Sequence, residues 1–315
     1  MSQMDLSIVI VSWNTRELLS DCIGSIKNNC DGLYCEIIVV DNASTDDTID
    51  VLKTKYPDVK LIRNQKNLGF STANNQGFHF AQGRYILILN PDTIVFPKTL
   101  SYLVSALDED KTIGAITAKV IWPDGSVQRS CARKEMNLWN FFCDQLGIAR
   151  LFPNIWALSG TQLPYKLYDV RRKVAVISGA FMMVRRDILT RIGGFDEEFF
   201  FAGDDVDLSY RIRREEYDII YEPSVQIVHI GGQSQKLSQI RIRKESLRGI
   251  FLFFKKHYPH TPIFVLRSII FIRLIIIMFI SVVLSILKND GHFKDNLLVN
   301  YEALKWLLFE SWKSI

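Results

Sequence analysis

The chain contains 315 residues, 48% of them hydrophobic and 23% charged, and its formal net charge is +4 at pH 7. This composition excludes a disordered chain, and the length allows one large domain with an appendage. The five cysteines form no Cys-x-x-Cys pair, so reduced thiols are favoured over a disulfide framework or a zinc site. The mild charge predicts no nucleic-acid partner, and the N-terminus has no signal-peptide pattern, which predicts a cytosolic globular part.

Strands and helices are predicted to alternate through the first third of the chain. Asn14 and Glu17 have the spacing of a capping box at the start of the first helix. Helical patterns lie around 18–26, 47–55 and 71–81, and short apolar runs indicate buried strands at 6–12, 36–40, 59–63 and 85–89. The alternation predicts right-handed βαβ units in an α/β, doubly wound, mostly parallel sheet flanked by helices.

Later segments are predicted to complete a globular domain at 1–235. Residues 131–173 lack clear periodicity, so we expect an irregular, partly helical insert of the kind that acts as a lid or binds a ligand. The Pro123-Asp124-Gly125 triplet predicts a hairpin turn. The other expected elements are a helix at 97–107, a strand at 113–122, a strand at 174–184 interrupted at Ser178-Gly179-Ala180, a helix ending near 216, and short strands at 218–221 and 225–229.

The strand at 85–89 is followed by Asn90-Pro91-Asp92. Pro91 cannot continue a central ladder, so the chain must turn there. Asp92 is thereby placed at the carboxyl end of a central strand, and ligands of open α/β sheets bind at this edge. Taken alone, the triplet is explained equally well as a turn with a capping Asp.

Further acids and one histidine follow other predicted strands or open the late helix: Asp41, Asp204, Asp205, Asp207 and His229. Acids at one sheet edge repel each other unless a cation or a basic ligand balances them. A hard divalent cation with few protein ligands, completed by phosphate oxygens and water, suits such an edge. Asp92 and a neutral His229 are the candidate ligands for Mg²⁺ or Mn²⁺. The alternatives are a core histidine for His229 and, as our preferred interpretation, a helix-capping role for Asp207.

Residues 236–315 form a helical region of different character. Nine Lys or Arg residues and one acid lie between 236 and 273, and 241–257 has an amphipathic pattern. Residues 262–287 are almost continuously apolar, but only about 14 uncharged residues follow Arg273, and a membrane span needs ~20. A mid-helix arginine also costs about 2.5–3.5 kcal/mol on insertion.

We therefore expect the apolar helix of this tail to lie in, or dip into, the inner leaflet, with the basic stretch on anionic lipid head groups. This places the protein at the cytoplasmic face of the inner (plasma) membrane, as a peripheral or tail-anchored protein. A true span is the first alternative. A helix buried against the domain or in a homo-oligomer is the second.

Six motifs, in this order and spacing, resemble those of family 2 glycosyltransferases with the GT-A fold. They are Ser-Ile-Val-Ile-Val-Ser-Trp-Asn, Val-Val-Asp-Asn-Ala-Ser-Thr-Asp-Asp-Thr, Asn-Leu-Gly-Phe-Ser-Thr-Ala-Asn-Asn-Gln-Gly, Asn-Pro-Asp, Ser-Gly-Ala-Phe and Gly-Gly-Phe-Asp-Glu-Glu-Phe-Phe. Each motif alone is a weak signal. The likeness covers about residues 5–232 and is greatest to bacterial rhamnosyltransferases of cell-surface polysaccharide assembly.

The resemblance implies a role for each matching position. Asp92 would be the metal carboxylate, with His229 near the diphosphate, and Asp205 matches the catalytic base. The acceptor site would include Gly179, Ala180 and Asp204. The nucleotide-sugar site would be built from Ser12, Asn14, Asp41, Asn67, Gly69, Asn74, Asn90 and Asp92. Asn90 stands where many relatives carry Asp, and Asp204 stands where relatives often carry Glu.

The reaction implied by the resemblance is inverting transfer of a sugar from a nucleoside diphosphate to a hydroxyl of a saccharide or a polyprenyl-linked saccharide. The best candidate donor is dTDP-L-rhamnose. An acceptor hydroxyl is a poor nucleophile, so a carboxylate must take its proton. The alternative is a catalytically inactive sugar-nucleotide binder or scaffold of an assembly complex. A nucleotidyltransferase or a dinucleotide-binding oxidoreductase is disfavoured, because no Gly-rich loop follows the first strand.

Overall fold

The computed structural model describes residues 4–30, 32–200, 202–231, 239–288 and 291–310. The chain divides into two compact units. The first comprises Met1–Glu135, Gln162–Phe200 and Asp204–Gln233, and the second comprises Met136–Thr161, Phe201–Gly203 and Ser234–Ile315. Part of the expected insert, 136–161, thus belongs to the same unit as the C-terminal region. The expected boundary at residue 235 and the start of the basic stretch lie outside the described residues.

A nine-stranded mixed sheet forms the core of the first unit, in the order β3-β2-β1-β4-β10-β6-β11-β5, with β8 paired to β11. The strands are β1 (Leu6–Ser12), β2 (Cys35–Asp41), β3 (Lys60–Arg63), β4 (Tyr85–Leu89), β5 (Thr93–Val95), β6 (Ile113–Ile121), β8 (Arg172–Lys173), β10 (Phe181–Arg185) and β11 (Asp218–His229). The run from β3 to β4 is parallel, β10 is antiparallel to both of its neighbours, and β11 is parallel to β6 but antiparallel to β5. The expected α/β class is confirmed.

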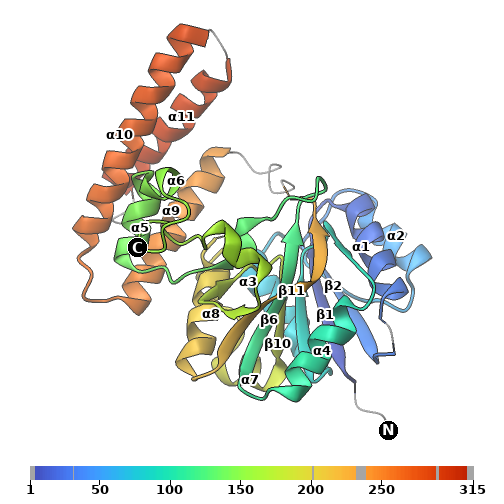
Figure 1. Ribbon diagram of the computed structural model, residues 1–315. Helices are drawn as coiled ribbons and strands as arrows, with labels where there is room; N and C mark the ends of the chain where they lie inside the picture. Colours follow the sequence, from blue (N-terminus) through green and yellow to red (C-terminus); the bar gives the residue numbers. More distant parts are fainter. Residues whose placement is uncertain (1–3, 31, 201, 232–238, 289–290, 311–315) are drawn as a thin grey trace. The chain divides into compact units, whose positions relative to one another are not determined.

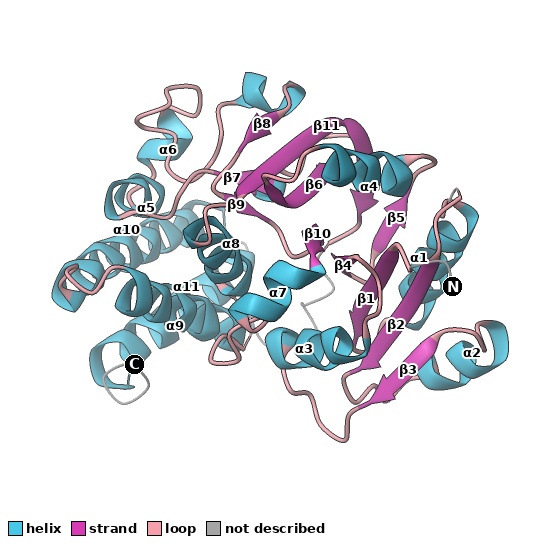
Figure 2. Ribbon diagram, turned by 90° about the horizontal axis from the view of Figure 1, so that it is seen from below, coloured by secondary structure: helices cyan, strands magenta, loops and turns pink. Residues whose placement is uncertain are grey.

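Helices cover both faces of this sheet, with α3, α7 and α8 on one side and α1 and α4 on the other (Figure 2). The helices of this unit are α1 (Arg16–Asn28), α2 (Thr48–Lys55), α3 (Phe70–Phe80), α4 (Thr99–Glu109), α7 (Arg186–Ile192) and α8 (Asp204–Arg214). Leu19, Cys22, Ile23 and Ile26 form the buried stripe of α1, as the helical pattern predicts. All five residues of β4 are buried, which is the reason for their continuously apolar sequence.

The predicted capping box is wrong. The first helix begins at Arg16 after Thr15, whose side chain makes no capping hydrogen bond. Asn14 has a left-handed backbone (φ 55°), and its Oδ1 accepts the Thr45 N–H at 2.7 Å. The turn directs the Asn14 amide away from the helix and toward the loop after β2, so the side chain joins two strand ends instead of capping α1.

The two short strands predicted at 218–221 and 225–229 need correction, whereas the interruption predicted within 174–184 is confirmed. The segments 218–221 and 225–229 form one strand, β11, because a register shift between Glu222 and Gln226 absorbs the intervening residues as a bulge. The segment 174–184 divides at its Gly-containing interruption. Its first part, β9 (Val176–Ile177), pairs with β7 (Ala132–Arg133) in a separate two-stranded sheet, and its second part is β10.

The turn after β6 and the short strand β5 also differ from the sequence predictions. Gly125 has a left-handed backbone (φ 84°), as the predicted turn requires, but the returning chain forms only an isolated bridge between Val127 and Ile121 instead of a hairpin strand. Strand β5 was not predicted. It is three residues long and follows a proline, so the sequence pattern is too short to indicate a strand.

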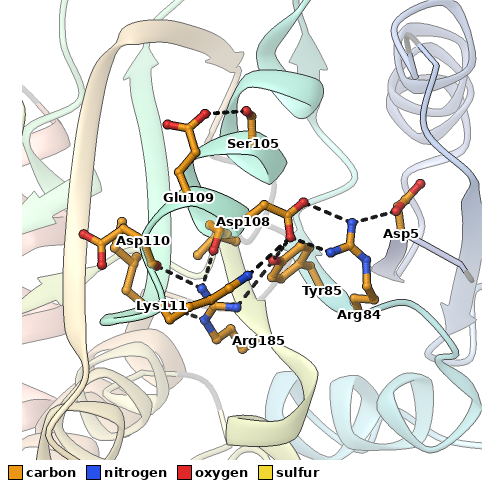
Figure 3. Close-up of polar contacts among 11 residues, drawn as sticks. Asp5, Arg84, Tyr85, Ser105, Asp108, Glu109, Asp110, Lys111 and Arg185 are labelled. Atoms are coloured by element: carbon orange, nitrogen blue, oxygen red, sulfur yellow. Dashed lines mark hydrogen bonds and ion pairs between the residues drawn. The ribbon is translucent and has the colours of Figure 1, made fainter.

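The amino end of β4 is held by a polar network (Figure 3). Arg84 forms ion pairs with Asp5 at 2.8 Å and with Asp108, and the Tyr85 hydroxyl donates to Asp108 Oδ1 at 2.8 Å. The guanidinium of Arg84 lowers the pKa of Asp108. Arg185 of β10 donates from Nε to the Ile113 carbonyl at 2.7 Å. These contacts tie β4 to the chain before β1 and to the end of α4, and the candidate site lies at the opposite end of β4.

The second unit is helical. Its helices are α5 (Leu138–Gln145), α6 (Ile148–Leu151), α9 (Gln239–His257), α10 (Ile263–Lys288) and α11 (Gly291–Lys305), followed by the π-helical turn η4 (Trp306–Glu310). Helices α10 and α11 lie side by side, and α10 also contacts α5 and α9 (Figure 1). Phe141 of α5 packs against Phe254 of α9, with ring centroids 5.5 Å apart.

Within the described residues, α10 is the one helix whose length and composition would allow it to cross a membrane, over Ile263–Leu287. Its two arginines have partners in the same unit: Arg267 donates to the Leu307 carbonyl and Arg273 to the Gln145 side chain. These hydrogen bonds reduce the cost of placing the arginines in an apolar helix. Its exposed large apolar side chains are Phe264, Phe271, Ile272, Ile275, Ile276, Phe279, Ile280, Val282, Val283, Ile286 and Leu287.

Gly77 allows α3 to lie directly on β1, which yields a stability prediction. A Cβ at Gly77 would lie 2.3 Å from Val9 Cγ1, whereas one at Gly24 of α1 would meet the Tyr56 hydroxyl at an ordinary 3.6 Å. We expect Gly77→Ala to lower the free energy of unfolding by about 1–3 kcal/mol through overpacking. Gly24→Ala is the matched control and should be neutral or stabilising by up to about 1 kcal/mol. Urea unfolding of both variants measures this, and equal effects would contradict the close approach.

Candidate functional site

The carboxyl ends of β1, β2 and β4 meet at one edge of the sheet. Ser12 and Asp41 are register partners at the ends of β1 and β2, and the Asn42 N–H donates to the Ser12 carbonyl at 2.8 Å. The Asn90 N–H, directly after β4, donates to the Ala180 carbonyl at 3.0 Å. Ser12 and Asp41, which are predicted to bind the nucleotide, therefore lie at the same sheet edge as Asn90 and Ala180. Asn90 is predicted to bind the nucleotide sugar, and Ala180 is predicted to line the acceptor site.

Asp41 is buried and only half satisfied. Its Oδ2 accepts the Ser44 N–H at 3.2 Å, whereas its Oδ1 is buried and has no hydrogen-bond partner among the described residues. A buried carboxylate oxygen without a donor is costly, so it indicates a missing hydrogen-bond donor. Nearby, the Ser12 and Thr15 hydroxyls lie 2.9 Å apart, and the Asn14 N–H donates to Ser44 Oγ at 2.9 Å.

Asn42 organises the loop before α3, and the sequence patterns did not single it out. Its Nδ2 donates to Asn67 Oδ1 at 3.0 Å and to the Gly69 carbonyl at 3.1 Å, and its Oδ1 accepts the Leu68 N–H at 3.0 Å. The side-chain oxygen of Asn67 is therefore used to hold the loop. The signal that was available is the position of Asn42, directly after a strand-ending Asp.

Gly69 and Asn74 lie at the start of α3. Gly69 has φ 85°, and a Cβ there would lie 2.7 Å from the Phe200 carbonyl oxygen, so no larger residue fits. Asn74 donates from Nδ2 to the Phe70 carbonyl at 2.9 Å. Its Oδ1 is buried without a partner among the described residues, which makes it a second unsatisfied acceptor of the strand-end region.

Asp92 and His229 converge from β4 and β11. The Asp92 carbonyl accepts the Ile230 N–H at 2.9 Å, and its Oδ2 accepts the Gly231 N–H at 3.0 Å. These two bonds direct Oδ1 toward His229 Nε2, 3.2 Å away. Asn90 Nδ2 lies 3.3 Å from the same ring nitrogen.

This pair is suited to a divalent cation with few protein ligands. Two cis ligands of an octahedral ion with bonds of ~2.1 Å lie ~3.0 Å apart, close to the observed separation of Oδ1 and Nε2. The described residues contain no group of three His, Cys, Asp or Glu side chains that would hold a metal by itself. The residues therefore fit an ion that completes its coordination with ligand oxygens and water.

Asp205 lies in the first turn of α8, close to the residues that follow β9. A Cβ at Gly179 would lie 3.9 Å from Asp205 Cβ and 3.3 Å from the Phe70 ring. Arg133 of β7 forms an ion pair with Asp205, with Nη2 to Oδ2 at 2.6 Å. Arg133 could not be predicted as a site residue, because it falls in the segment expected to be irregular.

Asp204 is buried next to Asp205, and its Oδ1 accepts the Asp205 N–H at 2.9 Å. Burial, together with the negative charge of Asp205, raises the pKa of Asp204 to about 8. The raised pKa favours the protonated form of Asp204, whereas Asp205 is the carboxylate that pairs with Arg133. The two adjacent acids therefore have different surroundings, since one is buried and the other is paired with an arginine.

A groove of about 860 Å³ lies elsewhere on the first unit, between α3 and α7, and is lined by Asn75, Phe78, His79, Ala81, Ile86, Arg186, Asp187, Leu189, Thr190, Gly193, Gly194 and Glu197. None of the predicted site residues lines it. The buried unsatisfied oxygens and the Asp92–His229 pair therefore locate the candidate site better than the size of a cavity does.

The model of the family described as Glycosyl transferase family 2 matches residues 7–193, which is more than half of the chain. The chain belongs to glycosyl transferase family 2. The matched range contains every predicted site residue of the nucleotide half, together with Gly179 and Ala180. Asp204, Asp205 and His229 follow it.

Two curated proteins are similar to this family 2 chain. It is 30% identical over 207 residues to the N-acetylglucosaminyl-diphospho-decaprenol L-rhamnosyltransferase of Mycobacterium tuberculosis, over 61% of this chain and 66% of that enzyme. It is 25% identical over 240 residues to the O-antigen biosynthesis protein RfbC of Myxococcus xanthus, over 75% of this chain and 18% of that protein. The predicted resemblance to family 2 glycosyltransferases is confirmed.

Solved structures show the same fold. The mannosyltransferase PcManGT of Pyrobaculum calidifontis, solved with GDP-Man and Mn²⁺, aligns over 98% of this chain and 88% of that chain, with a TM-score of 0.58 and 19% identity. GalNAc-T7, solved with UDP, GalNAc and Mn²⁺, aligns over 72% of this chain and 43% of that chain, with a TM-score of 0.56 and 17% identity. The predicted GT-A fold is confirmed.

The raised pKa of Asp204 predicts a pH-dependent stability. Between the ordinary Asp pKa of about 3.9 and about 8, the folded state binds a proton that the unfolded state has lost, so this group lowers the free energy of unfolding as pH rises. Asp204→Asn removes this term. We expect the stability of the variant relative to wild type to rise by at least about 1 kcal/mol between pH 5 and pH 8.

Urea unfolding at pH 5, 6.5 and 8 measures the difference between Asp204→Asn and wild type. Asp50→Asn is the control, because Asp50 is exposed on α2. A constant difference between Asp204→Asn and wild type across this range would mean that Asp204 is ionised in the folded protein.

Proposed function

We propose that this family 2 glycosyltransferase acts with inversion, moving a sugar from a nucleoside diphosphate to a hydroxyl of a saccharide or lipid-linked saccharide. L-Rhamnose from dTDP-L-rhamnose is the best candidate donor, because the mycobacterial relative is an L-rhamnosyltransferase by name. The observation that carries the proposal is the arrangement at the strand ends. Asp92 follows β4, His229 ends β11 and Asp205 lies in the first turn of α8. Gly179 lies next to Asp205, and the carbonyl of Ala180 accepts the Asn90 N–H beside the Asp92–His229 pair.

The nucleotide half of the site is proposed around Asp41. Its unsatisfied Oδ1 would accept the ring N–H of a pyrimidine base, which supplies the missing donor. The loops held by Asn14 and Asn42 would line the base and the ribose, with Ser12, Asn67 and Gly69 at the contact. The unsatisfied oxygen of Asn74 would accept a hydroxyl of the ribose or the sugar.

The leaving-group end is proposed at Asp92, Asn90 and His229. Asp92 Oδ1 and His229 Nε2 would hold Mg²⁺ or Mn²⁺, and the neighbouring structures of PcManGT and GalNAc-T7 contain Mn²⁺. A bound cation stabilises the negative charge that develops on the departing diphosphate. The Ile230 and Gly231 amides keep Asp92 in place, so little reorganisation is needed when the donor binds.

The proton chemistry is assigned to Asp205. The acceptor hydroxyl attacks C1 of the sugar as the bond from C1 to the diphosphate oxygen breaks, and its proton passes to Asp205. A single displacement inverts C1 and needs no enzyme nucleophile. Arg133 pairs with Asp205 Oδ2, so Oδ1 would be the oxygen that accepts the proton of the hydroxyl. Asp204, with Gly179 and Ala180, would line the acceptor side.

A lipid-linked acceptor is consistent with the second unit. The mycobacterial relative is named for a decaprenol-linked substrate, and α10 exposes an apolar surface long enough to enter a bilayer. We propose that the protein works at the cytoplasmic face of the plasma membrane, where the basic residues of α9 would face anionic head groups. An inactive sugar-nucleotide binder or scaffold is the alternative function.

Substitution of Asp205 separates an enzyme from a scaffold. We expect Asp205→Asn to reduce sugar transfer from dTDP-L-rhamnose by at least about 100-fold, because the acceptor proton has no base. Donor binding, followed as thermal stabilisation, should be retained. Asp187→Asn on α7, which also places an amide in a first helical turn, is the control. Undiminished transfer by Asp205→Asn would remove Asp205 from the role of base.

Membrane association is tested with the full-length protein and vesicles of phosphatidylglycerol and phosphatidylcholine. We expect the protein to sediment with the vesicles, and Phe279→Lys on α10 to weaken partitioning at least about tenfold, because a charge in the apolar region costs more than ~2 kcal/mol. Tyr34→Lys, at an exposed aromatic of the first unit, is the matched control. Equal sedimentation of Phe279→Lys and wild type would refute docking through α10.

A further inference from the structure

Gln128 holds His229 with both ends of its amide. Its Nε2 donates to the His229 backbone carbonyl, and its Oε1 lies 2.8 Å from His229 Nδ1. Gln128 is 4% exposed, and its own N–H donates to the Val120 carbonyl at 2.9 Å, which fixes it beside β6. The Gln128 side chain is therefore held in one place and contacts one residue of the candidate cation site from two directions.

The His229 carbonyl oxygen determines which end of the Gln128 amide faces the imidazole ring. A backbone carbonyl can only accept, so the NH₂ group of Gln128 must face the His229 carbonyl. Its oxygen then faces Nδ1, and the proton of a neutral His229 must lie on Nδ1. We propose that Gln128 is a positioning residue that fixes this tautomer and keeps the Nε2 lone pair available to a divalent cation. This rests on the proposed cation site at Asp92 and His229.

The opposite tautomer of His229 would leave no lone pair on Nε2 to bind a cation. With its proton on Nε2, His229 would donate to Asp92 Oδ1, which is 3.2 Å away, and the two ligand atoms would satisfy each other. A carboxylate beside an imidazole favours that arrangement. Gln128 opposes it by offering an acceptor to Nδ1, so Asp92 and His229 face each other with lone pairs that a cation can share.

Asn90 agrees with this polarity. Its Nδ2 lies 3.3 Å from His229 Nε2 and can donate to the lone pair there. An Asp at this position, as the resemblance to the family would suggest, would place a second carboxylate against the same lone pair. The His229 backbone carbonyl thus sets the orientation of the Gln128 amide, and that amide sets the tautomer of His229. Asn90 Nδ2 can then donate to the unprotonated Nε2.

The first test determines the tautomer of His229 in the absence of substrate and metal. Full-length wild type and Gln128→Leu, with ¹⁵N-labelled histidine, are compared by long-range ¹H–¹⁵N NMR at pH 8, above the ordinary histidine pKa of about 6.5. His229→Gln identifies the His229 signals. We expect protonated Nδ1 and unprotonated Nε2 in wild type, and the reverse in Gln128→Leu. Gln128→Glu keeps an acceptor against Nδ1 and should retain the wild-type tautomer.

The second test measures Mn²⁺ binding by electron paramagnetic resonance in the presence of dTDP. We expect Gln128→Leu to bind Mn²⁺ about tenfold more weakly, whereas its affinity for dTDP without metal should equal that of wild type. Asn29→Leu is the matched control, because Asn29 also donates its amide to backbone carbonyls, those of Ser25 and Val95, and neither bond involves Asp92 or His229. Its Mn²⁺ affinity should be unchanged.

The outcomes separate this inference from the proposed function. A folded Gln128→Leu variant that keeps its proton on Nδ1, or that binds Mn²⁺ as wild type does, overturns the role of Gln128. A Gln128→Glu variant with the reversed tautomer also overturns it. The NMR result needs no sugar transfer, so a wild-type protein without transferase activity would refute the proposed function and not the tautomer assignment.

Discussion

The site depends on the close approach of two groups that both carry lone pairs. Asp92 Oδ1 and His229 Nε2 lie 3.2 Å apart in a largely buried position, and Gln128 Oε1 lies 2.8 Å from Nδ1 on the far side of the ring, where the inferred tautomer has its proton. Such a contact is favourable only when a positive charge lies between the two atoms or a donor such as Asn90 caps the nitrogen. The surrounding backbone is arranged to hold this contact in the folded protein.

The strand order produces the approach. Strand β11 is parallel to β6 but continues past a bulge to pair with β5, the short segment that follows Asp92. Register pairs His229 with Thr93, and the next two amides, of Ile230 and Gly231, bond to Asp92. The other end of β4 is anchored by Arg84 and Tyr85, so the strand cannot slide relative to these contacts.

Residues that end a strand could be predicted from the sequence, and residues that meet across the fold could not. Asp41 and Asp92 follow apolar runs whose strand character is local, so their shared edge follows from βαβ geometry. Gln128 meets His229 across 101 positions, and Arg133 meets Asp205 across 72. These meetings depend on β7, β9 and the bulge of β11, which are too short or too irregular to leave a periodic pattern.

The negative charges of four buried or half-buried acids, Asp41, Asp92, Asp204 and Asp205, are compensated in four different ways. These differences indicate which of the acids bind ligands. Asp205 is paired with Arg133, and burial raises the pKa of Asp204 to about 8, which favours its protonated form. Neither acid therefore requires a bound ligand to balance its charge. Asp41 Oδ1 has no donor among the described residues, and Asp92 Oδ1 faces the lone pair of a histidine. These two carboxylates are incomplete without a ligand, and they are the ones proposed to meet the base and the diphosphate of one donor molecule.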